Sequence, residues 1–350
     1  MPIGPQFASL RIVQVTPLMV AGSQLIDRHG RFHDSLRISV TDRCNIRCFY
    51  CMPDVPDCHQ PRTDILTFDE IERVVQRAAA VGVRKLRFTG GDPLLRKDLP
   101  VLLRRVGGIP GIEEVALTTN GVLLGSQAPH LFAAGVRRIN VHLDTLDAVR
   151  YRTITRRDEL GRVMAGLDAA RRAGLSIKIN AVMIKNFSEP DLPLMARFGR
   201  ENGIEVRFIE FMPLDAGGLW ETGKVMPMDQ MLQILSDEVG PMVPVRMDDP
   251  RAPAVEYRFA DGIGRVGFIA SVTRPFCGNC NRLRLTADGK LRYCLFALEE
   301  TDLRTILRQG GDGEAIDHAI RCTIESKWAG HQIQTEAFVP PPRKMCSIGG

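Results

Sequence analysis

The sequence predicts an α/β protein that folds as a partial (β/α)6 barrel of the TIM-like kind, with a C-terminal extension. Three observations support this fold class. Six short apolar segments alternate with helical patterns between residues 36 and 239, the connections are short, and hairpin-like segments replace the pattern after about residue 245. Such alternation is typical of a parallel sheet covered by helices. Six units are too few for a closed eightfold barrel, so we expect an open one.

The six units follow one another in order. The first strand is expected at residues 36–40 and runs directly into a loop with three cysteines. Thr67 and Glu70 form a capping box that opens the first helix, which ends near Gly82. The later strands are expected at 83–89, 113–119, 137–143, 176–183 and 205–212. The later helices are expected at 98–106, 123–134, from the fourth strand to about 173, 191–202 and 228–239.

The C-terminal extension reads differently, as short strands and one late helix. Strands are expected at 257–259, 266–271, 283–286 and 290–295, with a tight turn at 287–290 and a helix at about 315–328. We therefore predict three regions: an N-terminal extension at 1–30, the barrel at 31–245 and the C-terminal region at 246–350.

Composition narrows the class of protein. The 350 residues are 44% hydrophobic and 25% charged, which is ordinary for a globular protein. No apolar run approaches the ~18 residues that span a bilayer, and the first 30 residues lack a secretory signal pattern. Aromatic residues are only 6% and basic runs are absent, so a nucleic-acid partner is not expected. Nine cysteines indicate a reducing, cytoplasmic setting and metal use, and the net charge of +5 suits an anionic substrate.

The first cysteine set is Cys44, Cys48 and Cys51, in C-x3-C-x2-C spacing. Thiolates are the usual ligands of cubane iron–sulfur clusters, and a fully protein-ligated cluster takes four. Three thiolates leave one iron open to a small molecule. A zinc site is the alternative, with Cys58 or His59 as the fourth ligand.

The second cysteine set is Cys277, Cys280 and Cys294, in C-x2-C-x13-C spacing. Taken alone, this spacing does not distinguish zinc from an iron–sulfur cluster. Two sets of three in one chain favour two open clusters. Cys58, Cys322 and Cys346 remain, and a buried thiol is the simplest interpretation of each.

Several polar segments fall where predicted strands end, which is the edge that builds the active site in βα barrels. They are the first cysteine loop and residues 89–92, 118–121, 142–144, 178–180 and 207–212. Gly-Gly and Asn-Gly pairs also turn the chain in purely structural loops, so these positions alone do not establish a site.

The first cysteine set, followed by Gly-Gly-Asp-Pro at 90–93, resembles the radical S-adenosylmethionine enzymes. Adding the second set, Asn-Arg-Leu-Arg at 281–284 and the terminal Gly-Gly makes the resemblance more specific. From about Leu36 to its last residue, the chain resembles the GTP 3′,8-cyclase family of molybdenum cofactor biosynthesis.

That resemblance implies a lyase with two [4Fe-4S] clusters and S-adenosylmethionine as cofactors. The first cluster would bind S-adenosylmethionine and yield a 5′-deoxyadenosyl radical, which takes the 3′ hydrogen of GTP before the sugar closes onto C8 of guanine. The second cluster, in the C-terminal extension, would hold the guanine. The implied partners are an electron donor and the cyclic pyranopterin monophosphate synthase that uses the product. A homodimer is a further expectation.

The resemblance also assigns residues. Those expected to contact S-adenosylmethionine are Tyr50, Gly91, His142 and Met212. Those expected to contact GTP are Arg37, Arg87, Thr118, Lys178, Arg282 and Arg284. Arginine forks and a lysine charge suit a triphosphate, although any one of them alone would read as a surface charge. The residues expected in the catalytic centre are Arg282, Arg284, Gly349 and Gly350, the last two as a tail that threads into the site.

Two positions depart from the family pattern. Asp92 replaces a glutamate, and His142 replaces a serine. Three rival interpretations remain at this point: a radical enzyme with an auxiliary cluster that acts on a peptide, a non-enzymatic zinc-binding module, and an inactive paralogue that binds clusters and GTP without turnover.

Overall fold

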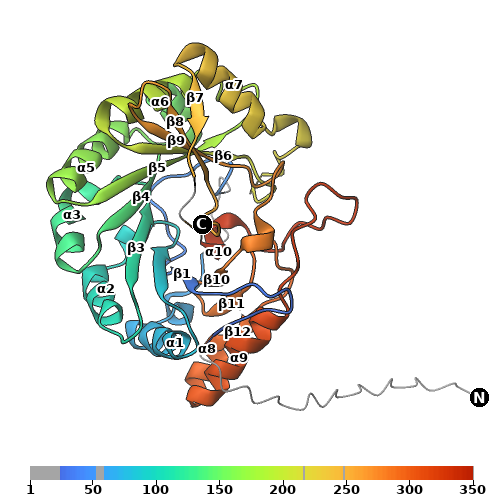
Figure 1. The fold of residues 1–350 in the computed structure, drawn as a ribbon. Coiled ribbons are helices and arrows are strands. Elements are labelled where there is room, and N and C mark those ends of the chain that lie inside the picture. The colour runs from blue at the N-terminus through green and yellow to red at the C-terminus, as the bar shows by residue number, and fades with distance from the viewer. Residues whose placement is uncertain (1–23, 53–58, 216, 247–248, 350) are drawn as a thin grey trace, which may run out of the picture.

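A computed structural model describes residues 24–52, 59–215, 217–246 and 249–349 (Figure 1). Its strands form one sheet in the order β12-β11-β10-β1-β2-β3-β4-β5-β6-β9-β8-β7. The six predicted barrel strands lie side by side in chain order, and each pairs in parallel with the next. They are β1 (Ser35–Ser39), β2 (Lys85–Thr89), β3 (Glu114–Thr119), β4 (Arg138–His142), β5 (Ser176–Met183) and β6 (Glu205–Glu210). The predicted partial barrel is confirmed.

Helices cover the outer face of these strands (Figure 1). They are α1 (Phe68–Ala80), α2 (Leu99–Gly107), α3 (Leu124–Ala133), α5 (Leu160–Arg172), α6 (Asp191–Asn202) and α7 (Met228–Glu238). The end of α4 (Ala148–Thr155) instead contacts the first cysteine loop, because the carbonyls of Ile154 and Thr155 accept the amides of Phe49 and Arg47. The predicted capping box is present at Thr67 and Glu70. The single helix expected after β4 is wrong, because Arg156 takes a left-handed conformation (φ 55°) that ends α4 before α5 begins.

The C-terminal strands flank both edges of the barrel. On one side β9 (Arg265–Ile269) pairs in parallel with β6, and β8 (Val255–Phe259) and β7 (Met242–Pro244) follow it. On the other side β10 (Arg282–Leu285) pairs in parallel with β1, and β11 (Lys290–Arg292) and β12 (Thr301–Asp302) follow it. The predicted hairpins, β8 with β9 and β10 with β11, are confirmed. The segment between β9 and β10 therefore joins the two edges of the open barrel.

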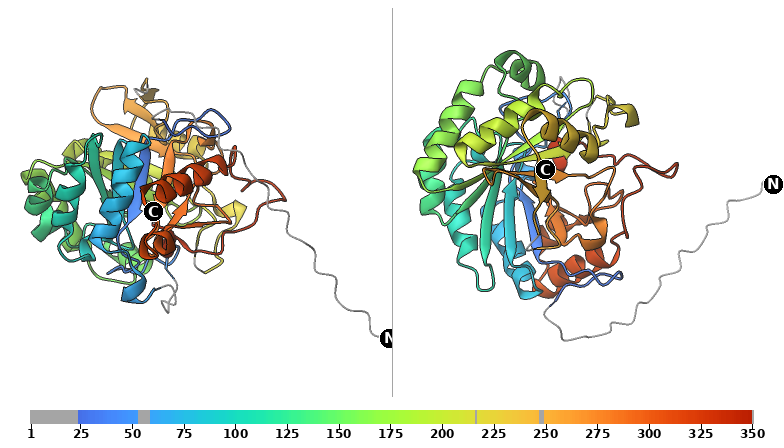
Figure 2. Two further views of the ribbon diagram at one scale, coloured as in Figure 1. Left: turned by 90° about the horizontal axis from the view of Figure 1, so that it is seen from below. Right: turned by 45° about the horizontal axis from the view of Figure 1, so that its top comes forward.

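The remaining elements of the described chain are three helices of the C-terminal region and four short turns in the loops. They are α8 (Leu303–Arg308), α9 (Gly313–Glu325), α10 (Met345–Ile348) and the short 3-10 turns η1 (Arg62–Asp64), η2 (Pro93–Leu95), η3 (Thr222–Lys224) and η4 (Cys277–Asn279). In Figure 2 the orange-to-red C-terminal region, which includes α8 and α9, lies away from the green helices α3 and α5. No helix within the described ranges is long and apolar enough to cross a membrane.

Strand alternation separates an apolar layer from a polar interior. On β1, Leu36 and Ile38 are fully buried in the main core between sheet and helices. Arg37 lies between them in sequence and so points to the other face. The register places Arg37 beside Arg284 of β10 and Arg87 of β2. A second apolar cluster packs the C-terminal tail, and its buried members are Leu214, Val225, Val272, Phe296, Ile333 and Ile348.

Candidate active site

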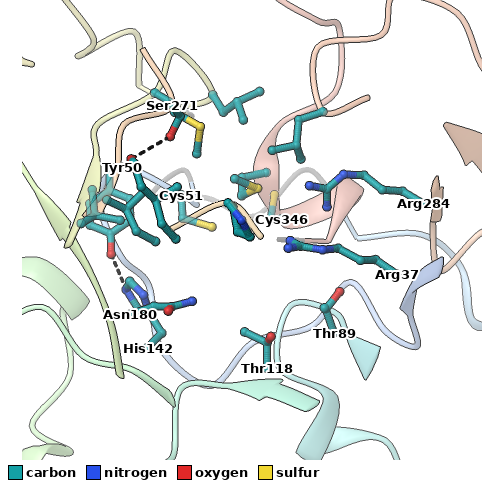
Figure 3. Close-up of a pocket in the computed structure, with 18 of the residues that line it drawn as sticks. Arg37, Tyr50, Cys51, Thr89, Thr118, His142, Asn180, Ser271, Arg284 and Cys346 are labelled. Carbon is teal, nitrogen blue, oxygen red and sulfur yellow. Dashed lines mark hydrogen bonds between the residues drawn. The ribbon is translucent and has the colours of Figure 1, made fainter. Parts of the chain in front are cut away.

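A cavity of about 310 Å³ lies inside the barrel at the carboxyl ends of the strands. Both cysteine sets line it, so segments more than 200 residues apart in sequence meet at one site. The other predicted site residues that line it are Arg37, Tyr50, Gly91, Thr118, His142, Met212, Arg282 and Arg284. Figure 3 shows Arg37 and Arg284 reaching toward the cavity from one side, and Tyr50 and His142 from the other.

The first cysteine loop is held by the Gly-Gly-Asp loop that follows β2. The backbone amide of Gly91 donates to the carbonyl of Thr41 (2.7 Å), and the amide of Asp92 donates to the carbonyl of Arg43 (2.7 Å). A Cβ atom on Gly91 would lie 2.2 Å from the carbonyl oxygen of Arg43. Only glycine allows this approach, so the Gly-Gly pair fixes the start of the cysteine loop.

The carboxylate of Asp92 is used inside the protein. It accepts hydrogen bonds from the amide of Leu94 (3.0 Å), the hydroxyl of Thr119 (2.7 Å) and the amide of Asn120 (2.7 Å). Asn120 in turn places its side-chain amide 3.5 Å from the Sγ of Cys44. Burial raises the pKa of Asp92 to about 6 against these three donors. The shorter acid thus links the second and third strand-end loops to the first cysteine set.

His142 occupies the second departing position and belongs to a hydrogen-bonded group. Its Nε2 lies 3.1 Å from a carboxylate oxygen of Asp144, and the hydroxyl of Tyr50 contacts both side chains. Burial lowers the pKa of His142, but the charge and hydrogen bond of Asp144 raise it above its ordinary value. Asp144 also accepts the amide of Val182 (2.8 Å). The imidazole therefore orients Tyr50, one residue before Cys51, at the cavity wall.

Cys280 of the second set lies beside a buried cation, Lys327, that the sequence analysis did not find. The ammonium of Lys327 lies 3.4 Å from the Sγ of Cys280 and donates to the carbonyl of Arg282 (2.8 Å). Burial raises the pKa of the Cys280 thiol, but Arg282 and Lys327 outweigh it and bring that pKa down to about 6. Cys280 is thereby prepared as a thiolate. No local sequence pattern marks Lys327, which follows an amphipathic helix.

Glu210 is a second functional residue that the sequence analysis did not single out. It is fully buried at the end of β6 and lines the cavity. Its carboxylate accepts the amides of Met228 (3.1 Å), Val272 (2.8 Å) and Thr273 (2.8 Å). It thus holds the start of the segment that leads from β9 to the second cysteine set. The sequence signal for it is a charged residue at the end of an otherwise apolar strand.

The predicted phosphate-binding cations fall into two layers. Arg37, Arg282 and Arg284 line the cavity, whereas Arg87 and Lys178 do not. Lys178 forms ion pairs with Glu205 (2.5 Å) and Glu256 (3.5 Å). Arg87 is half-buried, and its buried Nη1 atom has no hydrogen-bond partner. Arg87 and Lys178 therefore stand behind the cavity wall.

The arginines that line the cavity strongly affect one another. Burial and then the charges of Arg284 and Arg282 place the pKa of Arg37 well below its ordinary range. Burial and then Arg282 lower the pKa of Arg284 to about 9. Across the residues that the structure describes, no carboxylate forms an ion pair with any of these three arginines, and a buried Nη2 atom of Arg282 has no partner. Buried cations without a counter-charge are costly, so the arrangement suits an anionic ligand.

The C-terminal tail reaches this arginine cluster. The carbonyl of Gly349 accepts a hydrogen bond from Arg284 (3.0 Å). Gly349 has φ +84°, and a Cβ atom there would lie 2.8 Å from both Ser39 Cβ and Thr89 Oγ1. The tail thus passes where a side chain would collide. Cys346 on α10 also lines the cavity (Figure 3), and Gly350 lies outside the described residues.

The donor chemistry of both sets suits iron–sulfur clusters. Each offers three thiols around one shared cavity, with an amide near Cys44 and a cation near Cys280 as outer hydrogen-bond donors. In the part of the chain that the structure describes, no three His, Cys, Asp or Glu side chains are arranged to hold a single metal ion. A cubane spreads its ligands over several iron atoms, so it does not need that closer grouping.

Comparisons with known proteins decide the family. The model of the radical SAM superfamily matches residues 38–199, and the model for molybdenum cofactor synthesis C matches residues 204–333. The GTP 3′,8-cyclase of Rhodopirellula baltica is 49% identical over 333 residues, covering 93% of this chain and 92% of its own. The chain belongs to the GTP 3′,8-cyclase family. The GTP 3′,8-cyclase of Pelotomaculum thermopropionicum is 46% identical, covering 93% of this chain and 99% of its own.

Solved structures agree on the fold. SuiB of Streptococcus suis bound to S-adenosylmethionine superposes with a TM-score of 0.61, covering 84% of this chain and 69% of that chain at 16% identity. At that identity the likeness speaks for the fold alone. Membership of the radical SAM superfamily brings with it S-adenosylmethionine and an iron–sulfur cluster. The zinc-module interpretation of the sequence is therefore set aside.

Proposed function

We propose that this chain is an active GTP 3′,8-cyclase, a lyase that converts GTP to (8S)-3′,8-cyclo-7,8-dihydroguanosine 5′-triphosphate in the first step of molybdenum cofactor biosynthesis. One observation carries the proposal: two cysteine sets and an arginine cluster line a single cavity in a chain of this family. S-adenosylmethionine on the first cysteine set and GTP on the arginine cluster would then occupy the same cavity.

The S-adenosylmethionine half is the wall around Cys44, Cys48 and Cys51. When bound there, a reduced [4Fe-4S] cluster and S-adenosylmethionine supply the 5′-deoxyadenosyl radical. Tyr50, Gly91, His142 and Met212 line this half and would position the cofactor. The close packing of Gly91 on Arg43 keeps that loop in place. Asp144 holds His142 and Tyr50 in one orientation, so imidazole can replace serine as a hydrogen-bonding group.

The GTP half is the arginine wall. Arg37, Arg282 and Arg284 would bind the triphosphate, because its oxygens supply the anionic acceptors that these guanidinium groups lack within the described protein. Thr118 offers a hydroxyl, while Arg87 and Lys178 would act from behind the wall or after side-chain movement. A second [4Fe-4S] cluster on Cys277, Cys280 and Cys294 would hold the guanine. Arg282 and Arg284 with the tail at Gly349 and Gly350 would orient the sugar for ring closure.

The proposal also has consequences outside the site. Turnover needs an electron donor, and the product would pass to a cyclic pyranopterin monophosphate synthase. The cysteine-rich composition supports a reducing cytoplasmic setting. The boundary near residue 245 and a homodimeric state remain predictions.

The test is an anaerobic assay. The protein is reconstituted with iron and sulfide, then given reductant and S-adenosylmethionine with GTP, with ATP or with no nucleotide. We expect 5′-deoxyadenosine to form with GTP, together with a cyclised guanosine triphosphate. Equal cleavage in all three arms would reject GTP as substrate and favour a different radical enzyme. Full iron loading without cleavage would identify an inactive paralogue.

A further inference from the structure

Lys327 is a buried cation beside the second cysteine set, and the assignments above give it no role in binding GTP or S-adenosylmethionine. It follows the end of α9 and is 3% exposed. Its ammonium reaches the Sγ of Cys280 (3.4 Å) and the carbonyl of Arg282 (2.8 Å). Within the described ranges, no carboxylate forms an ion pair with Lys327. The sulfur of Cys280 is therefore the anionic group that this ammonium faces.

The surrounding chain is built to hold Lys327 there. The guanidinium of Arg31 donates to the carbonyls of Trp328 (2.6 Å) and Ala329 (2.8 Å), the two residues that follow Lys327. The same guanidinium donates to the carbonyl of Cys277 (2.8 Å). Asp27 fixes Arg31 through an ion pair at 2.6 Å. One buried arginine thus ties the lysine segment and the cysteine loop to each other.

A buried ammonium is retained only where an anion compensates its lost hydration. A thiolate-ligated iron–sulfur cluster is such an anion, and hydrogen bonds to its sulfurs and nearby charge set its reduction potential. Reduction adds negative charge to the cluster. A fixed cation at Cys280 therefore favours the reduced form.

We propose that Lys327 is a positioning residue that sets the reduction potential of the cluster on Cys277, Cys280 and Cys294 and holds Arg282 beside it. This inference rests on the second cluster of the proposed function. Because the ammonium donates to the carbonyl of Arg282, the same side chain couples the cluster to a residue of the arginine wall.

The experiment isolates the second cluster in the full chain. Cys44→Ala, Cys48→Ala and Cys51→Ala are combined, the protein is reconstituted anaerobically, and iron content and the midpoint potential are measured by redox titration with electron paramagnetic resonance. Lys327→Met, Lys327→Arg and Lys290→Met are then compared in this background. Lys290 pairs with Asp302 (2.5 Å) on the neighbouring hairpin and serves as the matched control.

We expect Lys327→Met to keep its iron and to titrate at a more negative potential than its parent, with Lys327→Arg and Lys290→Met close to the parent. An unchanged potential in Lys327→Met at full iron loading would overturn the role of Lys327 while leaving the second cluster established. If Lys327→Met loses its iron, Lys327→Gln replaces it as the neutral variant. A more negative potential in Lys327→Gln together with a parental potential in Lys327→Arg supports the role of the cation. A potential in Lys327→Gln that differs from the parent by no more than that of Lys290→Met overturns it. A parent that takes up no second cluster would overturn both the inference and that part of the proposed function.

Discussion

Cys44 of the first set and Cys280 of the second stand in opposite electrostatic surroundings. Burial, and then the nearby Asp92, raise the pKa of Cys44 to about 11. At Cys280 the cations Arg282 and Lys327 overcome burial and lower the pKa to about 6. The same residue type is therefore a thiol in one half of the cavity and a thiolate in the other before any iron binds. Cluster assembly must therefore release a proton from Cys44 that Cys280 has already lost at pH 7.

This contrast predicts the order of alkylation in the iron-free protein. At pH 7 iodoacetamide should modify Cys280 well before Cys44, since the thiolate is the nucleophile. The rate at Cys280 should rise with pH through about 6 and level off above it. Peptide mapping by mass spectrometry after short labelling at several pH values measures both rates. Equal labelling of the two residues across this range would contradict the assigned environments.

The raised pKa of Asp92 predicts that the stability of the protein depends on pH. Its pKa in the folded protein is about 6, above its ordinary value of 3.8, because burial disfavours the carboxylate. A carboxyl whose pKa is raised by folding stabilises the fold at low pH, and that contribution is lost as pH rises through about 6. The free energy of unfolding of the parent relative to Asp92→Asn should therefore fall by roughly 1 to 3 kcal/mol between pH 4 and pH 7.

Urea unfolding of the iron-free proteins at each pH measures this difference. Asp92→Asn should also be less stable than the parent at pH 4, by roughly 1 to 3 kcal/mol. The protonated carboxyl of the parent has one O–H, which the hydroxyl of Thr119 can accept, whereas an amide NH2 brings two N–H groups toward the donors of Thr119 and Asn120. A difference that grows with pH would show that the three hydrogen bonds outweigh burial.

At the scale of elements, loops at the strand ends build the site. The Gly-Gly loop after β2 packs so closely on the first cysteine loop that no side chain fits between them. Gly91→Ala would place a Cβ atom 2.2 Å from the carbonyl of Arg43, so the first cysteine loop has to move. We expect a loss of roughly 2 kcal/mol or more in stability and poor iron loading of the first set. Iron and sulfide analysis after reconstitution, together with urea unfolding, measures both effects.

Gly125→Ala is the matched control for this change. Gly125 lies in the first turn of α3, and nothing stands within 4 Å of where its Cβ would be. Alanine there should leave iron loading unchanged and raise stability by up to about 1 kcal/mol, as expected for a helical glycine. Normal first-set loading in Gly91→Ala would mean that the loop tolerates displacement.

Local sequence patterns predicted most of the helices and strands, but they did not predict which distant strands pair. The six strand–helix units, the capping box at Thr67 and the C-terminal hairpins follow from periodicity and caps within a few residues. The parallel pairing of β9 with β6 and of β10 with β1 joins distant segments, so no local signal specifies it. The break at Arg156 was missed because an arginine in the left-handed region has no sequence signature.

The site shows the same division. The two cysteine sets and most residues carried by the family resemblance line one cavity. Arg87 and Lys178 stand behind it, Gly349 contacts it through Arg284, and Gly350 lies outside the described residues. Lys327 and Glu210 were not found, because each acts through a partner far away in sequence. The use of Asp92 as an internal acceptor also depends on the neighbouring strand-end loop. Sequence spacing identifies ligands better than it identifies the groups that orient them.

At the scale of the whole molecule, two described segments from opposite parts of the sequence, residues 27–31 and 345–349, reach the site. The N-terminal loop at Asp27 and Arg31 fixes the second cysteine set, while the tail at Gly349 meets Arg284. Because Arg284 donates to Gly349, the tail helps to orient the arginine wall that we propose for GTP. Changes in the last residues should therefore reduce the yield of cyclised product per 5′-deoxyadenosine more than they reduce the stability of the fold.

Gly349→Ala tests this role of the tail. With φ +84° and close neighbours at Ser39 and Thr89, an added methyl group should displace the tail from Arg284. We expect cyclised product to fall at least about tenfold, while cleavage of S-adenosylmethionine in the presence of GTP and iron loading persist, because the lost interaction acts at the ring-closure step. The ratio of product to 5′-deoxyadenosine, measured by chromatography, reports the coupling. Gly310→Ala has a similar φ of +80° with nothing within 4 Å, so it isolates backbone strain from crowding at the site. An unchanged ratio in Gly349→Ala, or an equal fall of the ratio in Gly310→Ala, would show that the contact of the tail with Arg284 has no role in ring closure.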